Sequence, residues 1–217
     1  DFVTSANGSY NHLFGWKQLN MRLGRVPIAF GDEYKQYDAP DNPLVSHSVP
    51  FFWGFDEGAQ LYGNLSPDIS YTLHAFLDGE IGNGSDEFAS KAWGLRVEGN
   101  HGKAHWSASY FDSGRTGRAT QLPSLYFGRE LAAPIGANGA RGGASTSATI
   151  LSEWWEGDFR YTFDKGYIAL ARGYGNLHDD NVHDRTFEWF KVEPLYKIAR
   201  RWDLVGRYSG MNVEDAA

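Results

Sequence analysis

Apolar and polar residues alternate along most of this chain in short segments, with the two-residue period of β-strands. In segment 69–77, for example, Tyr71 and Leu73 alternate with Thr72 and His74. The same alternation occurs in segments 19–26, 57–65, 93–98, 103–110, 155–163 and 202–209. We therefore predict an all-β fold in which about nine or ten strands can be recognised.

Two further segments are strand-like but less regular. The pattern of 167–174 does not decide which side chains share a face. In 185–198, we expect the alternation to switch faces near Trp189.

The connections between these segments alternate strictly in length. Long links at 31–56, 79–90, 112–148 and 175–184 alternate with short links at 66–68, 99–102, 164–166 and 199–200. Up-and-down barrels have this rhythm when their short turns lie on the periplasmic side and their long loops outside. We therefore predict an antiparallel up-and-down transmembrane β-barrel, with residues 1–217 as one domain and with 31–56 and 112–148 as long extracellular loops.

Aromatic residues are expected at both ends of the predicted strands. Trp93 and Tyr110 lie toward the long links, whereas Phe163 and Trp202 lie beside short ones. Amphipathic rings favour both membrane interfaces, so this distribution predicts two aromatic girdles. The opposite parity carries charged residues, which would point into a wet lumen.

Composition agrees with this interpretation. The chain has 217 residues, 16% aromatic residues and a mean hydropathy of -0.48. It has no apolar run near the roughly 18 to 20 residues that a membrane helix needs. A transmembrane strand needs no such run, because only alternate residues face lipid. The net charge of -7 argues against binding to nucleic acid, and the absence of cysteine excludes disulfides and thiolate metal sites.

Candidate pore residues follow from the charges of the first long link and of the strands. Acidic residues of the link would face arginines of the lumen and form the constriction, since opposed charges create a transverse field that filters solutes. An acidic excess would make the channel weakly cation-preferring. The candidates are Asp32, Glu33, Asp38, Asp41, Arg22, Arg96, Arg160 and Arg207.

The sequence predicts no catalytic residue, no metal site and no cofactor. It contains no nucleophile elbow, phosphate-binding glycine loop or zinc motif. Glu153 and Glu156 are three residues apart, so they would point to opposite faces of a strand and could not act as a glycosidase pair. We therefore expect a protein that is not an enzyme.

Three stretches, LGRVPIAFGDEY, DAPDNPLVSHS and WGFDEGAQLYG, resemble bacterial outer-membrane porins, including the phosphate-selective-porin-like group. The resemblance covers about 40 residues and implies a passive diffusion channel for ions and small hydrophilic solutes. It also implies an outer-membrane location, contact with membrane lipid and lipopolysaccharide, and a homotrimer or a place in an outer-membrane complex. Because such barrels are larger, we expect this sequence to be a fragment of a barrel of about 16 strands.

Two other functions fit the same pattern. The chain could form a structural barrel that scaffolds an outer-membrane complex, with a partner in its lumen. It could instead be a soluble carbohydrate-binding β-sandwich, in which the charged face would simply be solvated.

Overall fold

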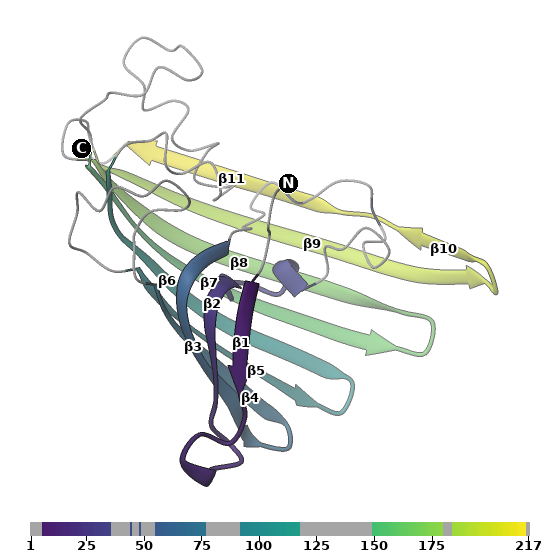
Figure 1. The fold of residues 1–217 in the computed structure, drawn as a ribbon. Coiled ribbons are helices and arrows are strands. Elements are labelled where there is room, and N and C mark those ends of the chain that lie inside the picture. The colour runs from purple at the N-terminus through teal and green to yellow at the C-terminus, as the bar shows by residue number, and fades with distance from the viewer. Residues whose placement is uncertain are drawn as a thin grey trace.

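The computed structural model describes residues 6–35, 44, 48, 55–76, 92–117, 149–179 and 184–215. These residues form eleven strands in a single antiparallel sheet, which is strongly curved (Figure 1). The strands are β1 (Ala6–Tyr10), β2 (Asn20–Pro27), β3 (Phe55–Ser66), β4 (Ile69–Phe76), β5 (Trp93–His101), β6 (Ala104–Gly117), β7 (Thr149–Phe163), β8 (Gly166–Asp179), β9 (Arg185–Ala199), β10 (Trp202–Val205) and β11 (Tyr208–Asp215).

Every strand from β1 to β9 pairs with the strand that follows it in the sequence, so the predicted up-and-down antiparallel topology is confirmed. The strands β10 and β11 both pair with β9 and continue each other along it, which leaves ten strand positions across the sheet. The four predicted short links join β3 to β4, β5 to β6, β7 to β8 and β9 to β10, and these turns gather at one end of the sheet (Figure 1).

The sheet is open in the part of the chain that the structure describes, because β1 and β11 stand at its two ends and do not pair with each other. The same residues form one sheet and not the two facing sheets that a carbohydrate-binding sandwich requires. Two 3₁₀ helices accompany it, η1 (Leu13–Gly15) and η2 (Glu33–Lys35). Within the described ranges, no helix has the length and apolar character needed to cross a membrane.

The burial of the two faces of the sheet is the reverse of that in a soluble protein, which buries its apolar face and exposes its polar face. The inner face, which carries His74, Arg96 and Asp158, is buried although it is largely polar. The outer face exposes large apolar side chains on every strand from β4 to β11. These include Leu73, Trp93, Leu95, Trp106, Trp155, Phe159, Tyr161, Ile168, Leu170, Tyr174, Phe190, Tyr196, Leu204 and Tyr208.

The predicted boundaries of the long link at 112–148 were wrong at its start. The strand β6 continues to Gly117 and pairs with β7, with a shift of register between Asp112 and Arg115. Gly114 has a φ of 61° there, and its N–H donates to Asp112 Oδ1 at 2.7 Å. The polar residues read as the start of a loop therefore form a β-bulge, in which glycine permits the left-handed conformation.

The predicted change of parity in β9 was also wrong. Phe187, Trp189, Lys191 and Glu193 are all buried on the inner face, so the alternation is continuous. The rings of Phe187 and Trp189 pack inside, against Trp154 of β7. In β8, whose facing the sequence left undecided, Ala171 lies on the inner face and Leu170 and Tyr174 are exposed on the outer one.

Candidate functional site

The segment that follows β2 and includes η2, residues 28–35, lies against the inner face of the sheet and is called the inner segment below. Its first residues, Ile28, Ala29 and Phe30, are almost completely buried. The ring centroid of Phe30 lies 6.2 Å from that of Trp154 in an edge-on arrangement and 6.5 Å from that of Trp189. This apolar start fixes the segment to β7 and β9, since buried aromatic contacts contribute both area and preferred geometry.

Gly31 brings the segment close to the wall and turns it. Its φ is 66°, and an added Cβ would lie 2.1 Å from Oε1 of Glu156. Its N–H donates to Ser109 Oγ at 3.0 Å. No residue other than glycine fits this position without displacing the Glu156 side chain, so the turn places Asp32 and Glu33 directly over the sheet.

Asp32 belongs to an ionic cluster on β5 and β6. Arg96 donates to Asp32 through Nη2 and to Glu98 Oε2 through Nη1 at 2.5 Å, and His105 Nε2 lies 3.1 Å from Asp32 Oδ1. Lys35 of the inner segment also donates to Glu98, at 2.5 Å from its Oε2. Burial alone would raise the pKa of Asp32, but the His105 hydrogen bond and the Arg96 charge outweigh it and hold that pKa well below its usual range.

Glu33 belongs to a second ionic cluster, which also lies on the inner face but near β9. Its carboxylate lies 3.2 Å from Lys191 Nζ on β9 and 3.8 Å from Arg207 Nη1, and it accepts the Ser48 N–H at 3.0 Å. Arg207 also pairs with Glu193 at 2.6 Å. The adjacent residues Asp32 and Glu33 thus bind different parts of the wall. Asp32 binds residues of β5 and β6, whereas Glu33 binds Lys191 of β9 and Arg207, which lies between β10 and β11.

The other predicted pore residues have different surroundings. The guanidinium carbon of Arg22 lies 5.0 Å from the centroid of the Tyr62 ring, a cation–π contact at the edge of the sheet. Arg160 lies half-buried on the inner face of β7. Asp38 and Asp41 lie outside the described residues. The structure therefore brings together Asp32 with Arg96, and Glu33 with Arg207.

Sequence reasoning missed Lys191 and Glu193, which complete the second cluster. The signal that could have found them is the local alternation after Trp189, in which Lys191 and Glu193 stand on the parity opposite to Phe190 and Val192. It also missed that Trp189 Nε1 donates to Glu156 at 2.5 Å. A polar face that includes large aromatic rings has no simple pattern in sequence.

The first cluster also contains three groups that could ligate a metal ion. Ligand atoms of Asp32, Glu98 and His105 lie within 4.8 Å of one another. However, the Arg96 guanidinium already bonds both carboxylates. The positively charged guanidinium of Arg96 therefore occupies the place where a metal ion would bind. We interpret Asp32, Glu98, His105 and Arg96 as an ion-pair network.

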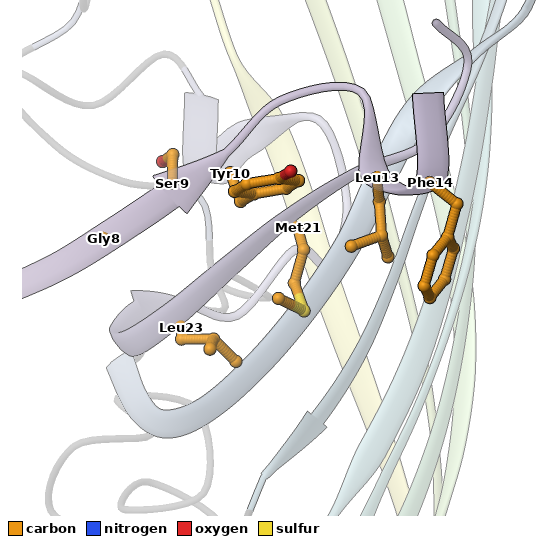
Figure 2. A pocket seen from close by; sticks show the side chains of 7 residues that line it. All are labelled: Gly8, Ser9, Tyr10, Leu13, Phe14, Met21 and Leu23. Atoms are coloured by element: carbon orange, nitrogen blue, oxygen red, sulfur yellow. The ribbon is translucent and has the colours of Figure 1, made fainter. Parts of the chain in front are cut away.

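A separate hollow of about 580 Å³ lies on the outer face over β1, η1 and β2 (Figure 2). Tyr10, Leu13, Phe14, Met21 and Leu23 point around it, and no charged side chain lines it among the described residues. It therefore belongs to the apolar surface and not to the charged inner face.

No family model matches this chain, and no curated protein matches it. Among solved structures, the chain is similar to in-vitro folded OmpT, an outer membrane protein of Vibrio cholerae, in its trimer form. The similarity covers 91% of this chain and 67% of that one, with 12% sequence identity and a TM-score of 0.45. Function is therefore inferred from the geometry of this chain.

Proposed function

We propose that the sheet is part of the wall of a transmembrane β-barrel in the bacterial outer membrane, and that the protein is a porin-like passive diffusion channel for ions and small hydrophilic solutes. The observation that carries the proposal is the inner segment, whose two acidic residues bond to bases on separate parts of a polar inner face. An inward-folded charged segment of this kind is the arrangement expected of a pore constriction.

The outer face supports the membrane location. In water, an exposed face rich in leucine and aromatic residues and a buried face rich in charges would both be unfavourable. In lipid the same arrangement is favourable, because tails contact the apolar face and the polar face encloses a wet lumen. Lipid, together with lipopolysaccharide outside, would then be the normal neighbour of the outer face.

The spacing of aromatic residues also fits a bilayer. On the outer face of β7, Trp155 stands near the middle of the strand and Phe163 stands at the short turn. At about 3.3 Å per residue, these positions are about 26 Å apart along the strand. The apolar band of outer-membrane barrels is about 25 Å tall and is flanked by aromatic girdles. With a strand tilt of about 35–45°, the projected height is about 19–22 Å, which covers most of this band.

Weak selectivity follows from how the charges are arranged. In the described part of the inner segment, Asp32 and Glu33 are each paired with a base, so neither presents an uncompensated charge to a passing ion. A cation preference would then depend on further acidic residues of the same link. The opposed rows of charge would still orient dipolar solutes.

The decisive experiment is single-channel conductance of the full chain in a planar bilayer under a salt gradient. Stable open steps, with a reversal potential on the cation side, would support a weakly cation-preferring channel. Glu33→Gln should change the conductance and the reversal potential, because it leaves Lys191 and Arg207 in excess at the constriction. Glu57→Gln, at an exposed position on β3, is the matched control and should change neither.

A second candidate function is a structural barrel whose interior is filled. It is favoured by the observation that the inner segment covers part of the wall from β5 to β9. Good insertion of the wild-type chain without current would support this function over the channel.

A further inference from the structure

Four basic residues gather at two neighbouring short turns of the sheet. Lys165 lies in the turn between β7 and β8, Lys197 lies near the end of β9, and Arg200 and Arg201 form the turn between β9 and β10 (Figure 1). The two turns adjoin, because the Lys197 N–H donates to the Lys165 carbonyl oxygen at 2.6 Å. These four residues are called the basic turn patch below.

The bases of the patch lack acidic partners in the part of the chain that the structure describes. All four side chains are exposed, and none of them makes an ion pair or a side-chain hydrogen bond with a described residue. At the same end of the sheet, by contrast, Lys103 pairs with Asp164 at 2.6 Å. Asp203 is opposite Lys197 in register but forms no ion pair with it. The patch is therefore a concentration of unpaired positive charge in a chain whose net charge is -7.

Large apolar side chains lie directly beside the patch on the outer face. Tyr196 of β9 and Leu204 of β10 are opposite each other, and both are exposed. Trp202 lies two residues nearer to the turn on β10 and is 73% exposed. Aromatic rings followed by lysine and arginine are typical of the level at which a protein passes from the apolar layer of a membrane to the headgroups.

We propose that the basic turn patch binds the headgroup phosphate of an anionic phospholipid, such as phosphatidylglycerol, in the membrane leaflet at the short-turn end. The inference rests on the membrane location proposed above and adds one class of lipid at one defined site. The lysine and arginine side chains donate to the phosphate oxygens, and the acyl chains of the same molecule lie along Tyr196, Trp202 and Leu204.

The chemistry of the surface is the reason for choosing this occupant. A molecule with an anionic head and an apolar tail contacts both the bases and the neighbouring rings, whereas a soluble anion contacts only the bases. A zwitterionic headgroup brings its own cation close to the patch, which offsets the attraction. The short turns of outer-membrane barrels face the periplasm, so lipopolysaccharide on the outside does not reach them.

Photo-cross-linking from one side chain in the turn tests the site in vesicles that contain equal amounts of phosphatidylglycerol and phosphatidylcholine. The chain has no cysteine, so Ala199→Cys, at an exposed position beside Arg200, takes a single benzophenone label. We expect mass spectrometry to find roughly fivefold more adduct with phosphatidylglycerol than with phosphatidylcholine. His101→Cys, in the exposed turn between β5 and β6, is the matched control and should label the two lipids about equally.

Salt and charge variants then separate the patch from a general attraction. In the wild-type background, the preference at position 199 should fall toward one at about 1 M salt, because exposed charges are screened. Replacing all four bases by glutamine should abolish the preference, whereas Arg200→Lys together with Arg201→Lys should keep most of it. Lys103→Gln removes one paired base from the same end and should leave the preference unchanged.

Inorganic phosphate distinguishes a lipid site from a site for soluble anions. The preference should persist when chloride is exchanged for inorganic phosphate at the same ionic strength. Its loss in phosphate would overturn the lipid assignment in favour of a soluble anion. A labelled product with a protein, in place of lipid, in outer membranes would overturn it in favour of an acidic protein partner.

The remaining outcomes keep this inference distinct from the proposed function. Equal labelling of both lipids at position 199, or a preference that survives the loss of all four bases, would overturn the patch while conductance persists. A preference for phosphatidylglycerol in a chain that carries no current would support the patch and overturn the channel. Failure of the wild-type chain to insert into membranes would overturn both.

Discussion

Trp154 and Trp155 are neighbours in β7, yet they belong to two different environments. Trp154 is 0% exposed and packs on the inner face, with its ring centroid 5.3 Å from that of Phe187. Trp155 is 57% exposed on the outer face and lies 4.2 Å from the Tyr110 ring. The strand's two-residue period separates them completely. In this sheet, the environment of a side chain therefore depends on the face that it occupies and not on its residue type alone.

The same contrast extends to whole faces. On the inner side, Asp32 and Glu33 are buried against bases, and polar groups are stabilised by partners on several strands. On the outer side, leucine and aromatic residues are exposed together with some charged residues, such as the Arg172–Glu188 and Arg25–Glu57 pairs. The inner face is therefore suited to water and the outer face to lipid. Substitutions that place a residue suited to one face on the other test this assignment most directly.

The largest effect is expected for Trp154→Ala. Removing this ring opens a cavity beside Phe30 and should lower the free energy of unfolding by about 3–5 kcal/mol, as measured by urea unfolding from lipid vesicles. Trp155→Ala should cost only about 1 kcal/mol, the value of one exposed aromatic pair. Equal losses at the two positions would contradict the assignment of the faces.

A charge on the outer face is expected to have the next largest effect. Leu170→Arg on β8 should reduce stability in vesicles by about 2–4 kcal/mol, because the guanidinium would enter the apolar band. Thr162→Arg, at an exposed position on the inner face of β7, is the control and should stay within about 0.5 kcal/mol. If both variants unfolded at the same urea concentration as the wild type, the outer face would not contact lipid.

Asp32→Asn should have an intermediate effect, since Arg96 keeps Glu98 as a partner. We expect a loss of about 1–3 kcal/mol and noisier single-channel currents, because the inner segment is held less firmly. The pKa of Asp32 is lowered in the folded protein, so its stabilising contribution is present above the ordinary carboxylate pKa and is lost as pH falls through the lowered value.

The pH dependence gives a separate measurement. The difference in unfolding free energy between wild type and Asp32→Asn should stay constant from roughly pH 8 to pH 5 and should shrink only below about pH 4. A difference that disappeared near neutral pH would show that the Asp32 carboxylate is not held by Arg96 and His105.

The smallest effect is expected at an exposed pair near the short turns. Lys103 and Asp164 lie 2.6 Å apart, but both side chains are mostly in solvent. Lys103→Gln should change stability by less than about 0.5 kcal/mol and should leave conductance unchanged. A larger loss would mean that this end of the sheet is covered in the native protein.

Much of the fold could be predicted from local sequence. The strand rhythm, the four short turns and the placement of Arg96 and Arg207 on the charged face follow from alternation alone. The errors occurred where local signals were ambiguous. The bulge at Gly114 has the composition of a turn, and the inward rings of Phe187 and Trp189 look like an outward apolar face.

By itself the sequence determined the all-β, up-and-down sheet and the chemistry of most side-chain positions, because a strand's period and its turn residues act over only a few neighbours. Only the tertiary structure decided that Glu33 pairs with Lys191, 158 positions away, and that Phe30 packs on Trp154. These contacts depend on how far the sheet curves and where Gly31 turns the chain. Curvature and loop direction arise from many distant pairings together, so no local pattern encodes them.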